Sequence, residues 1–156
     1  MSRRNISKKR LPPIDFKYNS FLVNLLIHRI LKCGKKTIAQ NLVYSAFDLI
    51  QMKTKKDPLI IFEKSIKKAR PLVEVKSKRV GGSTYQVPLK ITTFRSTILA
   101  LRWIIYHAKK RVGKNMAIKL ANEIIDTANA RGNTIKKKEE THKMAEANKA
   151  FAHYRY

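Results

Sequence analysis

The stretch from Lys76 to Pro88 constrains the fold of this chain more than any other. It reads KSKRVGGSTYQVP: basic residues lead into Gly81-Gly82, and an alternating strand leaves the glycines and ends in proline. Two such runs joined by two glycines are typical of a β-hairpin. A two-stranded ribbon alone is only marginally stable in water. The sequence therefore predicts a ribbon over residues 72–92 that is held by the rest of the chain.

The segments on both sides of the ribbon have helical spacing or helix-capping residues. Six helices are predicted, three before the ribbon and three after it, and they begin near Phe21, Lys35, Asp57-Pro58, Thr93, Asn115 and Thr134. In the second helix, one apolar stripe predicts the buried face: Ile38, Leu42, Ala46, Leu49 and Ile50. We interpret the 156 residues as one mainly α domain, a six-helix bundle with a protruding two-stranded ribbon between helices three and four.

The C-terminal segment, residues 134–156, is polar and has a thin apolar stripe. It ends in the aromatic residues Phe151, Tyr154 and Tyr156. Two interpretations stay open: this end docks on a neighbour instead of filling the core, or it frays.

Alternation along the two strands divides the ribbon into a base and a tip. We expect a register that pairs Val75 with Leu89, because it brings the apolar residues together near the helical body. The same register places Arg79 opposite Tyr85 near the tip. The base would then pack on helices while the tip stays polar, aromatic and cationic, which favours a binding arm over an ordinary surface hairpin.

The charge of the chain indicates a polyanionic partner. Its 35 Lys and Arg against 10 Asp and Glu give a net charge of +25, and self-repulsion on this scale opposes compaction unless a polyanion neutralises it. Nucleic acid is the leading partner and an anionic membrane surface the second. Residues 93–115 hold six Lys or Arg and no acid, whereas 116–156 hold eight and five, so one face is predicted to bind.

The sequence contains no recognisable catalytic, metal-binding or nucleotide-binding motif. A single cysteine, Cys33, excludes an internal disulfide and a CxxC motif, and the four histidines lack metal-binding spacing. The run Gly34-Lys35-Lys36-Thr37 lacks the first glycine of a P-loop and the Ser or Thr directly after its lysine. No stretch reaches the roughly 20 apolar residues of a membrane span, and the start lacks the apolar core of a signal peptide. We therefore expect no enzyme, no cofactor, no metal and no membrane partner.

The cations fall into four groups that we expect to contact the phosphates of a nucleic acid. Residues 1–18, interrupted by two prolines, form an extended basic arm, and Lys35-Lys36 open a helix whose N-terminus favours anions. A third group shares one side of the fourth helix and its following loop, and the ribbon supplies the fourth, in which Tyr85 could stack on a base. The predicted nucleic-acid-binding residues, which the resemblance described next assigns to RNA, are Arg3, Arg4, Lys8, Lys9, Arg10, Lys35, Lys36, Lys76, Lys78, Arg79, Gly81, Gly82, Tyr85, Arg95, Arg102, Lys109, Lys110, Arg111 and Lys114.

Three long motifs carry a resemblance to a known family. They are Ser20-Phe-Leu with Gly34-Lys35-Lys36, the ribbon VEVKSKRVGGSTYQVP, and the ending KEETHKMAEANKAFAHYR. With them the chain resembles, nearly end to end, the universal small-subunit ribosomal protein seven family in its bacterial and plastid form. The loop from Arg111 to Asn115 varies, and the N-terminal arm matches only in character.

The resemblance implies six helices with a ribbon between the third and fourth. It implies binding to the 3′ major domain of 16S-type rRNA early in assembly of the subunit head. It also implies a ribbon near exit-site tRNA and mRNA, and other head and platform proteins as neighbours. The ending looks plastid-like, so the plastid stroma is the expected location and the bacterial cytoplasm the alternative.

Two other function classes share parts of this pattern. A basic architectural DNA-binding protein with a β-arm is also helical and cationic. A membrane-surface protein is less well supported, because no predicted helix has one continuous basic amphipathic face.

Overall fold

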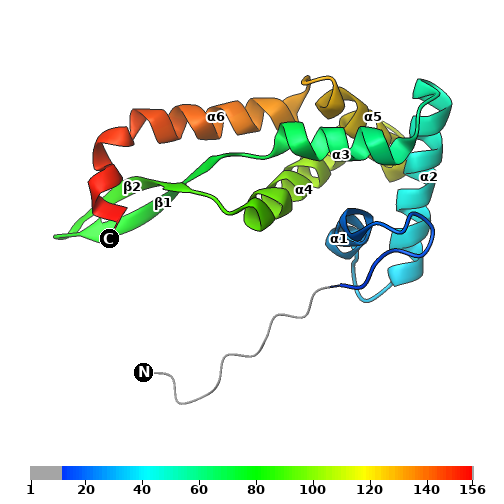
Figure 1. The fold of residues 1–156 in the computed structure, drawn as a ribbon, viewed down its shortest axis with the longest axis horizontal. Helices are drawn as coiled ribbons and strands as arrows, with labels where there is room; N and C mark the ends of the chain where they lie inside the picture. Colours follow the sequence, from blue (N-terminus) through cyan, green and yellow to red (C-terminus); the bar gives the residue numbers. More distant parts are fainter. Residues whose placement is uncertain (1–11, 156) are drawn as a thin grey trace, which may run out of the picture.

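The computed structural model describes residues 12–155. Within this range the chain forms seven helices, the last of them a short 3-10 helix, and one antiparallel hairpin between α3 and α4 (Figure 1). The predicted mainly helical fold with a ribbon between the third and fourth helices is confirmed. The elements are α1 (Phe21–Ile30), α2 (Lys36–Thr54), α3 (Pro58–Ala69), β1 (Val73–Val80), β2 (Ser83–Lys90), α4 (Thr93–Lys110), α5 (Met116–Ala128), α6 (Asn133–Ala147) and η1 (Lys149–Arg155).

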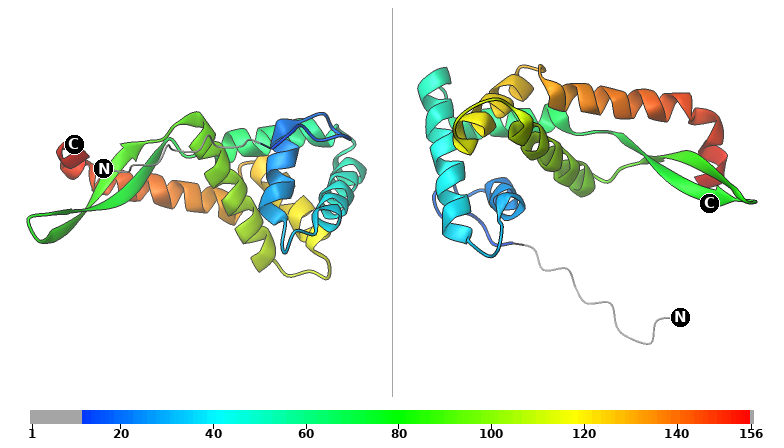
Figure 2. Two further views of the ribbon diagram at one scale, coloured as in Figure 1. Left: turned by 90° about the horizontal axis from the view of Figure 1, so that it is seen from below. Right: turned by 180° about the vertical axis from the view of Figure 1, so that it is seen from behind.

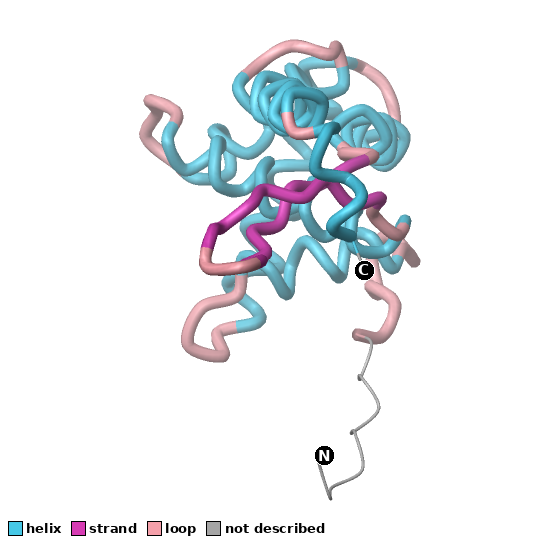
Figure 3. The backbone as a smooth tube through the Cα atoms, turned by 90° about the vertical axis from the view of Figure 1, so that its left-hand side faces the viewer, coloured by secondary structure: helices cyan, strands magenta, loops and turns pink. Residues whose placement is uncertain are grey.

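The described part of the chain is elongated. Helices α1 to α5 gather at one end, and the ribbon and α6 extend together toward the other (Figures 1 and 2). At the far end η1 folds back onto the ribbon. Figure 3, seen from that end, places the ribbon in front of the helical body.

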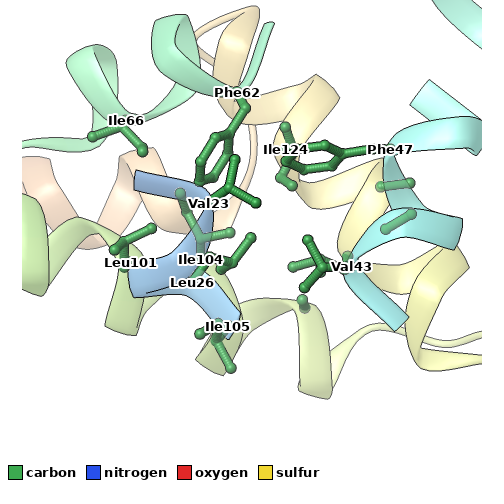
Figure 4. Close-up of a cluster of buried hydrophobic side chains, with 14 of the residues drawn as sticks. Val23, Leu26, Val43, Phe47, Phe62, Ile66, Leu101, Ile104, Ile105 and Ile124 are labelled. Atoms are coloured by element: carbon green, nitrogen blue, oxygen red, sulfur yellow. The ribbon is translucent and has the colours of Figure 1, made fainter. Parts of the chain in front are cut away.

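The hydrophobic core lies among α1 to α5 (Figure 4). Each of these helices contributes side chains with no exposed surface, including Leu26, Val43, Phe62, Ile104 and Ile124. Their burial supplies the main free energy that holds the five helices together. In α6 only Thr134, Ile135 and Ala145 are buried, and none of them belongs to the core cluster, so this helix contributes little to the core.

The buried face of α2 differs from the predicted stripe. Ala46 and Ile50 are buried as expected, but Ile38 is 60% exposed, and Val43 and Phe47 are fully buried instead. Both stripes fit the helical period, so spacing alone does not decide between them. The observed face buries the Phe47 ring against Phe62, with ring centroids 5.3 Å apart.

Both ends of α3 are set by local residues, as the sequence predicts. The Asp57 side chain accepts a hydrogen bond from the Leu59 N–H at 2.9 Å, and Pro58 occupies the first turn. At the other end Arg70 is extended, because the following Pro71 disfavours helical backbone at that residue. The chain is thereby directed out of the helical body into β1.

The predicted register of the ribbon is wrong by one position. Gly81 and Gly82 have φ of +58° and +89°, so they form a two-residue turn of the type that glycine favours. This turn pairs Val80 with Ser83, and it places Lys78 opposite Tyr85 and Val75 opposite Pro88. Because a shift of one residue exchanges the faces of a strand, Tyr85 shares a face with Lys78 and not with Arg79.

The C-terminal aromatic residues dock on this Tyr85 face. The Tyr85 ring lies 5.2 Å from both the Phe151 and Tyr154 rings, measured between centroids. Lys78 Nζ donates a hydrogen bond to the Tyr154 carbonyl at 2.9 Å, and Val87 nearby is only 2% exposed. The C-terminal end therefore docks and does not fray, and it docks on the ribbon of the same chain.

Helix α6 is tied to the root of the ribbon by polar contacts. Lys138 Nζ donates to the Lys68 carbonyl at 2.7 Å, and the Leu72 N–H donates to His142 Nε2 at 3.1 Å. A ring nitrogen that accepts a hydrogen bond must be unprotonated. Burial, with a smaller effect from the charge of Lys138, lowers the pKa of His142 and keeps the ring neutral.

The His142 contact makes a pH dependence testable. The pKa of His142 in the folded protein lies below its unfolded value of about 6.5. The stability that the neutral ring contributes through this hydrogen bond is therefore complete above about pH 6.5, and it is lost as the pH falls through the folded pKa. We expect the stability difference between wild type and His142→Ala to shrink as pH is lowered from about 7.5 to 5. Urea midpoints across this range measure it, with the exposed His28→Ala as control. A difference that is constant across the range contradicts the assignment.

Candidate nucleic-acid interface

The predicted RNA-binding residues lie in separate regions of the fold. Arg3, Arg4, Lys8, Lys9 and Arg10 fall outside the described residues. The others lie at the start of α2, along α4, in the loop between α4 and α5, and on the ribbon.

The ends of α1, α2 and α4 bring three lysines together. The tight turn after α1, with Cys33 and Gly34 at positive φ, sets Lys32 and Lys35 on one side. These two and Lys109, near the end of α4, line a hollow of about 390 Å³. Its remaining walls are apolar and include Ile38, which is 60% exposed, and Leu42, which also packs against the core. Lys36 follows in the first turn of α2 and is half-buried.

Two arginines extend this cationic region along α1 and α4. Arg29 and Arg102 are both exposed. Partial burial and the neighbouring charge of Arg102 lower the pKa of Arg29, so two like charges lie close together. Within residues 12–155, no carboxylate forms an ion pair with Arg102, Lys109, Lys32 or Lys35. Uncompensated cations of this kind suit a surface that meets a polyanion.

Arg95 does have an acidic partner, although its own helix, α4, contains no Asp or Glu. Arg95 Nε lies 2.9 Å from both carboxylate oxygens of Glu74 on β1, and Lys76 Nζ is 3.6 Å from the same group. The pattern of α4 did not reveal this acid because it belongs to another element. Arg95 therefore joins α4 to the ribbon root, and less of its charge is available to a ligand.

Arg111 is likewise compensated within the protein. It forms ion pairs with Glu123, whose side chain is 1% exposed, and with Asp126. Glu123 also accepts a hydrogen bond from Thr134 Oγ1 at 2.5 Å, which connects α5 to the start of α6. Arg111 is thus a structural link, whereas its neighbours Lys110 and Lys114 are exposed.

The ribbon divides differently from the expected base and tip. Arg79, Gly81 and Gly82 are exposed at the turn. Tyr85 is half-buried between aromatic rings of η1, and Lys78 donates to η1. The free part of the tip is therefore cationic and glycine-rich, and its tyrosine faces the protein.

Sequence reasoning missed four cations near these regions: Arg29, Lys32, Lys136 and Lys137. Lys32 could have been found from its place two residues before Gly34. Helical spacing would allow Lys136 to pair with Glu140, but the structure pairs Lys137 with Glu140 at 3.1 Å. Lys136 is exposed beside the end of α4.

Comparison with known proteins identifies the family. The family model described as "Ribosomal protein S7p/S5e" matches residues 1–149. The chain belongs to the ribosomal protein S7p/S5e family. Small ribosomal subunit protein uS7c of Trieres chinensis is 66% identical over 144 residues, 92% of this chain and 91% of that protein. The uS7 proteins of Microcystis aeruginosa and Synechococcus elongatus are 58% and 54% identical over the full length of both chains.

Membership of the S7p/S5e family confirms the resemblance and decides among the function classes. The chain is a structural constituent of the small ribosomal subunit that takes part in translation, and it is not an enzyme. Its partners are rRNA and other ribosomal proteins. The described helices include none long and apolar enough to cross a membrane.

Proposed function

We propose that the chain binds the 3′ major domain of 16S-type rRNA and nucleates assembly of the subunit head. Its ribbon lies near exit-site tRNA and mRNA, and other head and platform proteins are its neighbours. The observation that carries the rRNA part is the convergence around one hollow of Lys32 and Lys35, from the turn between α1 and α2, and Lys109, near the end of α4. Phosphate contacts supply affinity, and RNA shape with unpaired bases supplies specificity.

The ribbon tip supports contact with a nucleic-acid backbone. Gly81 and Gly82 carry no side chains, so a phosphate can approach the turn closely, and Arg79 adds a charge beside them. Tyr85 acts by holding the ribbon to η1, because its ring already packs against Phe151 and Tyr154. Arg95 and Lys76 act chiefly through Glu74 at the root.

The plastid stroma is the proposed location, with the bacterial cytoplasm as the alternative. The uS7c protein of Trieres chinensis is 66% identical to the chain, and the cyanobacterial proteins are 54–58% identical. This difference supports a plastid ribosome.

Crosslinking in cells, followed by sequencing of the bound RNA, tests the proposed site. We expect the reads to concentrate in the 3′ major domain of the small-subunit rRNA, with weaker signals in tRNA and mRNA from the ribbon. Cells that have not been crosslinked serve as the background control. Reads that concentrate outside the small-subunit head would reject this proposal, although the chain would still be a ribosomal protein.

A further inference from the structure

We infer that the hollow between α4 and α6 holds one unpaired nucleotide of the bound RNA, with its base against Trp103 and Tyr106. The inference rests on the proposed rRNA binding and adds a subsite to it. This hollow is separate from the one lined by Lys35 and Lys109, and none of its aromatic residues was among the predicted RNA contacts.

The hollow has the size and the walls of a small-ligand site. Its volume is about 590 Å³, within the roughly 300–1,000 Å³ of typical ligand pockets. The α4 wall carries Trp103, Tyr106 and His107, and the α6 wall begins at Asn133. Tyr106 is 51% exposed, so a face or edge of this ring is open to a ligand.

Neighbouring side chains hold the Tyr106 ring. Lys110 Nζ lies 4.5 Å from the ring centroid, and the His107 ring packs edge-on against it at 5.2 Å. Burial lowers the pKa of His107, so its ring is neutral and the aromatic wall carries no charge of its own. A ring held in this way is pre-organised for stacking, and less conformational freedom is lost on binding.

The charges around the rim suit a phosphate. Arg102, Lys110, Lys136 and Lys137 line the hollow with a single carboxylate, Glu140, which is paired with Lys137 at 3.1 Å. Arg102 and Lys110 come from α4 and Lys136 from α6, so the cations surround the aromatic wall. A nucleotide has both an aromatic base and an anionic phosphate, and it uses both features of this site.

An acidic peptide of a neighbouring protein would use only half of the site. Carboxylates need cations and hydrogen-bond donors but gain little from two aromatic side chains side by side. A duplex would also fit poorly, because its bases are stacked on each other and only its phosphates reach the rim. The chemistry therefore favours an unpaired nucleotide.

The single tryptophan of the chain makes this site directly observable. Trp103 is the only one, so its fluorescence reports on the hollow alone. The full chain is titrated with a 3′ major domain rRNA transcript, with oligouridylate, with an RNA duplex of equal length and with polyglutamate. Trp103 emission and its accessibility to acrylamide are measured, and RNA affinity is measured in parallel by filter binding.

We expect the transcript and oligouridylate to quench Trp103 and shield it from acrylamide, and the duplex and polyglutamate to do neither. Tyr106→Leu should weaken oligouridylate binding about 5- to 30-fold, since it removes base stacking but keeps an apolar side chain. Phe94→Leu, at another exposed aromatic residue of α4 that is 44% exposed, is the matched control and should bind as wild type. Circular dichroism checks that both variants fold.

Three results would overturn the inference. Transcript binding that leaves Trp103 emission and accessibility unchanged would reject the subsite, yet leave the proposed function standing. Equal protection by polyglutamate or the duplex would mean a general anion site. Failure of the wild type to bind the transcript would reject the proposed function as well. If Tyr106→Leu does not fold, crosslinking of 4-thiouridine-containing RNA to wild type decides, because the inference requires adducts within residues 102–110.

Discussion

The affinity of the chain for a 3′ major domain rRNA fragment is expected to fall by about 10³- to 10⁵-fold between roughly 50 and 200 mM salt. A protein that neutralises six to ten phosphates releases the cations condensed on them, and added salt opposes this release. The exposed cations Lys32, Lys35 and Lys109, which have no acidic partner in the described part of the chain, form a face that can neutralise phosphates in this way. Filter binding over a series of salt concentrations measures the slope.

The same assay tests individual lysines of this face. Replacing Lys32 and Lys109 together by alanine should reduce the slope of log affinity against log salt by about 0.7 to 0.9 for each phosphate that is no longer neutralised. Lys53→Ala is the control, because Lys53 lies at the far end of α2 and donates to Asn122 Oδ1 at 2.6 Å. An unchanged slope in the double variant would remove these lysines from the interface, and a salt-independent affinity would contradict electrostatic binding altogether.

The second large effect concerns stability. Arg111→Met is expected to lower the free energy of unfolding by about 3 kcal/mol, at the lower end of the range for broken buried pairs. The substitution leaves the Glu123 carboxylate, 1% exposed, without its cation, while the partial exposure of Arg111 lets some water in. Urea unfolding of both proteins measures the difference.

A double-mutant cycle separates the ion pair from the loss of the long side chain. Glu123→Gln removes the buried charge but keeps a group that can accept from Thr134, so Arg111→Met should cost much less in this background. Lys114→Met, at an exposed cation in the same loop, should leave stability within about 0.5 kcal/mol of wild type. Equal costs of Arg111→Met in both backgrounds would mean that the pair contributes nothing.

The ribbon illustrates how far local sequence signals reach. Gly81-Gly82 and the flanking alternation located the hairpin correctly between two helices. Matching apolar residues across the strands then predicted the wrong register, because turn geometry was not included. A two-residue turn with both φ values positive leaves one possible pairing, and it moves Tyr85 to the face that η1 covers.

The interface and its compensating acids depend on packing that local patterns do not contain. Glu74, Glu123 and Asp126 each pair with a cation from another element or from the preceding loop. No spacing within one helix predicts such pairs. For the same reason the sequence predicted cations on α2 and α4 but not that Lys35 and Lys109 would line one hollow.

The docking of η1 on the ribbon has a consequence for the order in which the chain matures. Translation releases residues 73–90 well before the seven residues 149–155 that cover Tyr85. Because a two-stranded hairpin has little stability by itself, the ribbon gains this support only after residues 149–155 have been synthesised. A released chain that ends before residue 149 would thus have a folded helical body but a ribbon without this support.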